Sequence, residues 1–197
     1  MTAREDPIRI LVHADESCLG NDSTKPSPGG NAALIEARAG DSVARWDLFE
    51  CSPQTTNNRM ALAGAIATLE WIRRQWKRAR VIYVSDSQYL VKGMNEWVEG
   101  WQARGWRRKG GALENLELWQ KLVQAEQAHE DVTWAWVEGH AGHAKNEYAN
   151  DLAIGAAERQ ERSNGLVPSG FDTWLAAQRA RGKYADYDPD REVYERV

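Results

Sequence analysis

Residues 81–86 read VIYVSD, four apolar or aromatic residues followed by a serine and an aspartate. A short apolar run with polar neighbours predicts a buried β-strand, which here ends at Asp86. The segment before it predicts a helix, because its apolar residues recur every three or four positions: Leu62, Ile66, Leu69, Ile72 and Trp76. A helix followed directly by a buried strand is typical of a crossover between parallel strands.

The beginning of the chain supplies the strand to which this crossover returns. Residues 8–15, IRILVHAD, alternate in polarity and predict a strand that ends at Asp15. Residues 31–39 and 42–50 predict a hairpin beside it. Because the carboxyl ends of neighbouring parallel strands lie at one edge of a sheet, we expect Asp15 and Asp86 to meet there.

The remaining segments complete an α/β fold. We expect helices over 90–101, 114–129 and 147–162, and a strand over 132–137. The predicted architecture is a mixed five-stranded sheet, three antiparallel strands followed by two parallel ones, with flanking helices. Residues 1–162 are expected to form one domain. Residues 163–197 form a C-terminal extension that has one short helix candidate and packs on the domain, pairs with another copy or remains mobile.

Charge is distributed unevenly along the chain, although its formal net charge is only −4. Residues 71–110 hold ten Lys or Arg and three acidic residues, a local charge of +7, together with five tryptophans. A basic, aromatic surface of this kind favours a phosphate backbone as partner, although solvated helix faces explain the composition equally well.

Other classes of protein are disfavoured by the sequence. We find no apolar run as long as a membrane span and no secretion signal, so we expect a cytoplasmic protein. We also expect a monomer. Two distant cysteines, Cys18 and Cys51, predict neither a disulfide framework nor a zinc site.

Three aspartates are candidates for a metal site: Asp15, Asp86 and Asp151. Glu147 precedes Asp151 by four residues and so shares its helix face. Carboxylates that converge without cysteine favour a hard cation, Mg²⁺ with Mn²⁺ as a substitute.

Several ordered motifs resemble those of the type 1 ribonuclease H family over about residues 8–160. They are DESCLGN, PGG, TTNNRM, SDSQY, WVEGWQARGWRRKGG, NLELWQ and WVEGHAGHAKNEYANDLA. The resemblance implies a ribonuclease H-like fold and an endonuclease that hydrolyses the RNA strand of RNA/DNA hybrids with two metal ions. It implies metal ligation by Asp15, Asp86 and Asp151, and a proton-handling or product-releasing role for His140, which without the resemblance is simply an exposed loop residue.

The resemblance also implies a substrate surface. Asn57 and Asn58 match positions that face the minor groove of the hybrid, and Thr56 and Asn21 match a pocket for a DNA phosphate. A helix N-cap explains the TTNN segment as well. The other matching positions are Cys18 and Gln88, followed by a basic protrusion formed by Trp97, Trp101, Arg104, Trp106, Arg107, Arg108 and Lys109. Some of these tryptophans are equally explained as core residues.

One position departs from the family pattern. The family has a catalytic glutamate directly after TTNNRM, where this chain has Ala61, and it has a glycine after its first aspartate, where this chain has Glu16. Either Ala61 was introduced by engineering, or Glu16 replaces the missing carboxylate as a catalytic metal ligand. Strand alternation argues against the second explanation, because it points adjacent side chains to opposite faces. A hybrid-binding module without cleavage is the alternative function.

Overall fold

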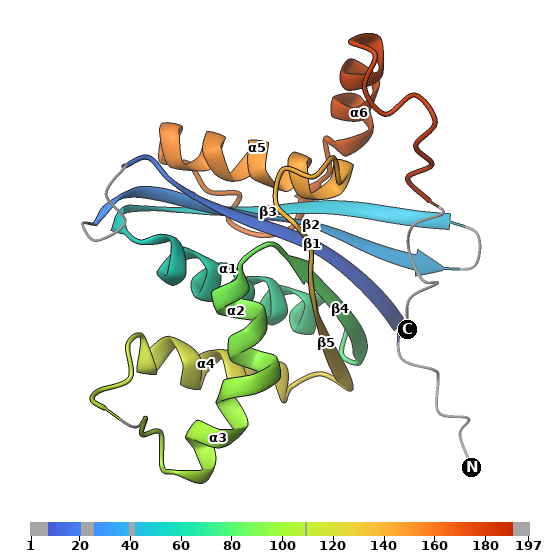
Figure 1. The fold of residues 1–197 in the computed structure, drawn as a ribbon. Helices are drawn as coiled ribbons and strands as arrows, with labels where there is room; N and C mark the ends of the chain where they lie inside the picture. Colours follow the sequence, from blue (N-terminus) through green and yellow to red (C-terminus); the bar gives the residue numbers. More distant parts are fainter. Residues whose placement is uncertain (1–7, 21–25, 40–41, 109, 191–197) are drawn as a thin grey trace, which may run out of the picture.

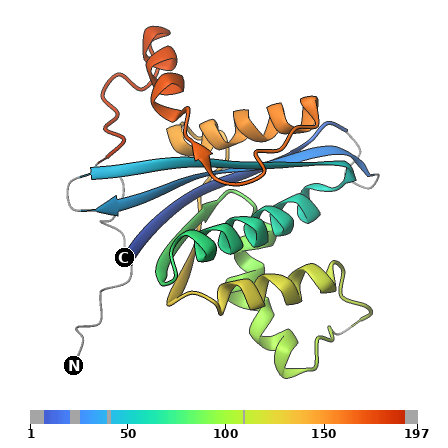
Figure 2. The same ribbon diagram turned by 180° about the vertical axis from the view of Figure 1, so that it is seen from behind.

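The computed structural model describes residues 8–20, 26–39, 42–108 and 110–190. They form a sheet in the order β5-β4-β1-β2-β3-β6, with helices on both faces (Figures 1 and 2). Its strands are β1 (Ile8–Cys18), β2 (Ser27–Ala39), β3 (Ser42–Thr55), β4 (Ala79–Ser85), β5 (Asp131–Trp136) and β6 (Val167–Pro168). As predicted, β1, β2 and β3 are antiparallel, and β4 and β5 run parallel to β1.

The prediction of five strands is wrong, because β6 adds a sixth strand beside β3. It pairs Val167 with Asp47 and Pro168 with Trp46. Two residues are too few to show alternation, and a proline argues against a strand unless it lies at a sheet edge. The pairing therefore depends on the position of β3 and not on a local sequence signal.

Strand β1 also continues beyond the predicted end at Asp15. It pairs with β2 as far as Cys18 and Gly29, whereas its pairing with β4 ends at Ala14 and Ser85. Pairing with β2 keeps β1 extended beyond the point where its pairing with β4 ends. The last residues of β1 therefore lie beside the open end of β4.

One face of the sheet is covered by α1 (Asn57–Gln75), with α4 (Leu116–Glu126) packed against it. Thr56 is the N-cap of α1, since its hydroxyl accepts a hydrogen bond from the Arg59 backbone N–H at 3.4 Å. The predicted apolar stripe faces the sheet, where Leu62, Leu69 and Ile72 are fully buried. Burial of this stripe fixes how α1 lies on the sheet.

The helix predicted over 90–101 is interrupted. It consists of α2 (Gln88–Lys92), a π-helical turn at Gly93–Trp97 and α3 (Val98–Ala103). A Cβ atom at Gly93 would lie 2.0 Å from the Trp119 ring, so glycine is needed for α4 to pack this closely. Long-range packing here overrides a regular helical pattern.

The other face is covered by α5 (Ala144–Arg159), and α6 (Phe171–Ala180) packs on α5 (Figure 1). Gly30 lets α5 approach β2 closely, because a Cβ atom there would lie 2.4 Å from the Ala153 carbonyl oxygen. No helix in the described part of the chain is long and apolar enough to cross a membrane.

Candidate active site

Three carboxylates meet where β4 ends. Asp15 and Glu16 come from β1, and Asp86 follows the last residue of β4. One oxygen from each of these three side chains lies within 4.8 Å of the other two oxygens. The predicted meeting of Asp15 and Asp86 at one sheet edge is therefore found, and Glu16 joins them.

Strand alternation does not separate Asp15 from Glu16. Glu16 lies two positions after Ala14, on the face covered by α1, whereas Asp15 contacts α5 on the opposite face. Because β4 has already ended, no paired strand separates the two faces on that side of β1. The longer glutamate side chain can therefore reach around the edge toward Asp15, and it accepts a hydrogen bond from the Ser87 side chain.

Ala61 lies on α1, buried in the same apolar cluster as Ala14. Within the described residues, α1 contributes no carboxylate to the group formed by Asp15, Glu16 and Asp86. Glu16 thus enters the site from the face of the sheet on which Ala61 lies.

Burial raises the pKa values of all three acids, and repulsion between carboxylates adds to the rise for Asp15 and Glu16. Burial is the main cause that raises the pKa of Asp15 to about 8, and the charge of Asp86 adds to it. Hydrogen bonds from the Glu16 backbone N–H and the Asn146 amide act in the opposite direction and lower it. Burial, then the charges of Asp15 and Asp86, holds the pKa of Glu16 well above its usual value. Burial also raises the pKa of Asp86, and the nearby charge of His140 opposes that rise. A bound cation would relieve this repulsion and displace the protons.

Helix α5 contributes an amide that sequence reasoning missed. The buried Asn146 donates a hydrogen bond from Nδ2 to Asp15 Oδ2 at 3.0 Å. The Asn146 Oδ1 atom is buried and has no hydrogen-bond partner among the described residues. The sequence signal was available, since Asn146 lies within the GHAGHAKN motif, but an amide is not a conspicuous metal-site residue.

Asp151 does not join the three converging carboxylates. It is exposed on α5 and accepts a hydrogen bond from Trp174 Nε1 of α6 at 2.7 Å. On a helix, position 150 follows position 146 on the same face, whereas Asp151 shares a face with Glu147. The helix face directed at Asp15 thus carries Asn146 and the half-buried Asn150.

The loop between β5 and α5 lies over Asp86. A Cβ atom at Gly139 would approach Asp86 Oδ2 to 2.5 Å, and Trp136 Nε1 donates to the Asp86 carbonyl oxygen at 3.0 Å. His140 is exposed, adopts a left-handed backbone with φ 56°, and is close enough for its charge to act on Asp86. His140 thus lies on a loop near Asp86, and its predicted role in proton handling or product release stays a prediction.

Comparison with known proteins identifies the family and the fold. The sequence matches the RNase H family over residues 7–158. The chain belongs to the ribonuclease H family. The Ribonuclease H of Syntrophotalea carbinolica is 46% identical over 150 residues, which cover 76% of this chain and 91% of that protein. The Ribonuclease H of Methylococcus capsulatus is 43% identical over 145 residues, which cover 73% and 86%.

A solved structure extends the similarity beyond the family match. LC9-RNase H1, described as a type 1 RNase H with the type 2 active-site motif, is 44% identical and superposes with a TM-score of 0.84. The superposition covers 95% of this chain and 94% of that one. The chain is a ribonuclease H, a metal-dependent endoribonuclease.

Several other predicted positions of this ribonuclease H lie at the end of β1 and at the starts of α1 and α2. Asn57 and Asn58 are exposed in the first turn of α1, Gln88 is exposed at the start of α2, and Cys18 is half-buried at the end of β1. Gln88 Oε1 accepts a hydrogen bond from Lys92 at 3.0 Å. Thr56 caps α1, so its capping role is observed. Asn21 lies outside the described residues.

The predicted basic protrusion is α3 with the loop after it. Arg104, Arg107 and Arg108 are exposed, and Lys109 lies outside the described residues. The tryptophans are half-buried, and Trp101 packs on Trp119 with ring centroids 5.4 Å apart. The aromatic rings therefore support the protrusion while the guanidinium groups face solvent.

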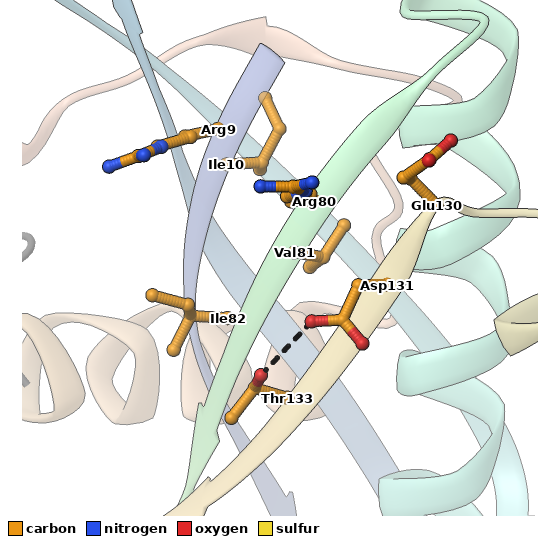
Figure 3. A pocket seen from close by; sticks show the side chains of 8 residues that line it. All are labelled: Arg9, Ile10, Arg80, Val81, Ile82, Glu130, Asp131 and Thr133. Carbon is orange, nitrogen blue, oxygen red and sulfur yellow. Dashed lines mark hydrogen bonds between the residues drawn. The ribbon is translucent and has the colours of Figure 1, made fainter. Parts of the chain in front are cut away.

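A sizeable hollow of this ribonuclease H lies away from the acids. It has a volume of about 470 Å³, and Figure 3 shows its lining residues, including Arg9, Arg80 and Asp131, near the starts of β1, β4 and β5. The acids lie toward the opposite, carboxyl ends of β1 and β4. A nucleic acid bound at the acids would therefore lie on an open surface and not in this hollow.

Proposed function

We propose that this ribonuclease H hydrolyses the RNA strand of RNA/DNA hybrids at a metal site in which Glu16 replaces the carboxylate missing at Ala61. The convergence of Asp15, Glu16 and Asp86 within 4.8 Å carries this proposal. Glu16 approaches from the sheet face that α1 covers, so its carboxylate lies on the side where an α1 glutamate would lie.

The residues at this site fit Mg²⁺ or Mn²⁺. The donors are carboxylate oxygens, and the buried amide oxygen of Asn146 adds a polar atom without a hydrogen-bond partner. Three mutually repelling acids beside a phosphate-binding surface are unfavourable unless a cation neutralises them. When bound, divalent ions in such a site polarise the phosphate and lower the pKa of water.

The protein's own groups have separable roles. Asp15, Glu16 and Asp86 hold the metal, and Asn146 orients Asp15 through its 3.0 Å hydrogen bond. His140 lies near Asp86 on a loop, where an imidazole can pass a proton to or from the reacting groups. We leave Asp151 out of the metal-holding group, because its carboxylate is engaged by Trp174.

The substrate surface holds the hybrid around the carboxylates. The exposed amides of Asn57 and Asn58 are placed to face the minor groove, where the 2′-hydroxyl groups distinguish RNA from DNA. The first turn of α1, capped by Thr56, suits a phosphate. The remaining contacts are assigned to Cys18, Asn21, Gln88 and the basic protrusion, which grips the backbone without reading bases.

Natural rearrangement explains Ala61 better than engineering does. Ala61 is packed among apolar residues, and Glu16 is directed at the other acids. The description of LC9-RNase H1 as a type 1 enzyme with a type 2 motif supports the view that type 1 enzymes can carry another arrangement of acids.

Cleavage of a labelled RNA/DNA hybrid in Mg²⁺ and in Mn²⁺ tests the proposal. We expect the chain to cleave, and we expect Glu16→Gln to lower the rate by about 100-fold or more while hybrid binding persists. Asp131→Asn, on the exposed start of β5, is the matched control and should leave the rate unchanged. An inactive chain that gains activity only through Ala61→Glu would refute the role of Glu16 and support a binding module instead.

A further inference from the structure

The segment after α5 returns to the sheet. The Ser163 backbone N–H donates to the Phe49 carbonyl oxygen at 2.9 Å, and β6 then pairs with β3. Helix α6 follows and packs on α5 (Figure 1). Residues 163–175 therefore join β3 to the helix that carries Asn146.

A buried carboxylate connects β3, α5 and the segment that precedes α6. Asp47 of β3 accepts hydrogen bonds from the Tyr148 hydroxyl at 2.6 Å, the Ser169 hydroxyl at 2.7 Å and the Gly170 backbone N–H at 3.0 Å. Burial raises the pKa of Asp47, and these three donors oppose that rise. One side chain thus holds α5 and the extension against β3.

An ion-pair cluster forms a second attachment near the start of α5. Lys145 Nζ lies 2.8 Å from Glu36 Oε2, and both side chains are fully buried. Arg45 Nε lies 2.8 Å from Glu36 Oε1, and its other nitrogens pair with Asp172 and Asp190 of the extension. Acidic residues of the extension therefore balance the cations that surround one buried glutamate.

Aromatic packing completes the contact between α5 and the extension. The ring centroids of Tyr148 and Phe171 are 5.3 Å apart, and those of Tyr148 and Trp174 are 5.5 Å apart. Phe171 and Leu175 are buried in this cluster. The contact combines apolar packing with directional polar bonds, so it defines both the position and the rotation of α5.

We infer that Asp47, Tyr148, Ser169 and Gly170 are positioning residues, through which the C-terminal extension holds Asn146 against Asp15. Asn146 and Tyr148 are two residues apart, about 3 Å along the helix axis, and both are buried. A helix is stiff over this length, so a shift at Tyr148 moves Asn146 as well. The 3.0 Å bond from Asn146 to Asp15 then transmits the shift to the carboxylates.

This inference rests on the proposed metal site and adds a role for residues outside the family match. Residues 163–175 touch none of the three converging acids, yet their attachment determines where the amide beside Asp15 lies. A purely stabilising extension would raise the free energy of unfolding without altering the metal affinity of the folded protein.

The test measures Mn²⁺ binding to the full-length, folded protein by electron paramagnetic resonance, without hybrid. We expect Tyr148→Phe and Ser169→Ala each to weaken Mn²⁺ binding by about threefold to tenfold, less than the 10–100-fold typical of direct partners of metal ligands. The half-saturating Mg²⁺ concentration for cleavage should rise by the same factor, with the KM for hybrid unchanged. If Tyr148→Phe does not fold, Ser169→Ala alone decides the test, because it leaves two of the three bonds to Asp47.

A matched control separates positioning from stability. Trp134→Phe likewise removes a hydrogen bond from an aromatic side chain to a carboxylate, here the 2.7 Å bond from Trp134 Nε1 to Glu126 Oε1. Trp134 lies on β5, away from α5. The substitution should lower the melting temperature without changing Mn²⁺ affinity. Mn²⁺ affinities of Tyr148→Phe and Ser169→Ala equal to wild type would overturn the inference. Asp15→Asn should abolish the binding; if it binds as wild type does, the proposed metal site itself fails.

Discussion

The pH dependence of stability provides a direct test of the carboxylate site. Burial and Asp86 raise the pKa of Asp15 to about 8 in the folded protein, whereas an unfolded aspartate titrates near 3.8. Between these values the folded state binds more protons than the unfolded state. Metal-free stability is therefore lost as the pH rises through this window, and it is greatest at the acidic end.

The size of the effect follows from the two pKa values. One pH unit of difference is worth about 1.4 kcal/mol, so an isolated group of this kind would lose at most about 4 kcal/mol between pH 4 and pH 7. Glu16 and Asp86 also have raised pKa values, so the effect is distributed over the three acids, and the site can admit water. We therefore expect Asp15 to contribute about 2–4 kcal/mol to this loss.

Urea unfolding in EDTA at several pH values between 4.5 and 8 measures this loss. Asp15→Asn should reduce the pH dependence, and the exposed Asp131→Asn should not. Adding Mg²⁺ at pH 8 should restore stability, because the cation binds the folded form. Metal-free stability that stays constant or rises between pH 5 and 8, or an unaltered slope in Asp15→Asn, would refute the reasoning.

Three further predictions concern packing and substrate. Lys145→Met should lower the free energy of unfolding by about 2–4 kcal/mol in urea denaturation, because Glu36 stays buried with one cation fewer; a loss below about 1 kcal/mol would contradict a well-paired buried charge. Gly93→Ala should lower the melting temperature by several degrees in thermal denaturation, since its Cβ would lie 2.0 Å from the Trp119 ring; an unchanged value would show that the ring can move. Arg107→Ala should weaken hybrid binding similarly for all sequences and reduce the salt dependence of the logarithm of affinity by about one, measured by fluorescence anisotropy; a sequence-dependent loss would instead indicate base contacts.

Much of the fold was predictable because its signals are local. Alternation over residues 8–15, the helical stripe from Leu62 to Trp76 and the apolar run 81–86 each identify an element without knowledge of its partners. The right-handed crossover rule then brings Asp15 and Asp86 to one edge. The structure confirms these elements, while their ends depend on the pairing of strands.

The missed features depend on contacts between distant residues. Strand β6 has no periodicity of its own and exists because β3 offers an unpaired edge. The π-helical turn accompanies the close approach of Trp119 to Gly93. The role of the extension is also invisible locally, because Ser169 meets Asp47 across 122 positions of sequence.

At the candidate site, the amino-acid sequence by itself determined the family, the acidic character of the sheet edge and the absence of a carboxylate at Ala61. Tertiary structure alone decided that Glu16 joins Asp15 and Asp86 and that Asp151 does not. Alternation places Asp15 and Glu16 on opposite faces, but β4 ends at Ser85 and leaves the edge open to both side chains. Likewise Asp151 faces Trp174 and Asn146 faces Asp15. Their spacing along the helix places them on different faces, but the residues packed against α5 decide which face is directed at Asp15.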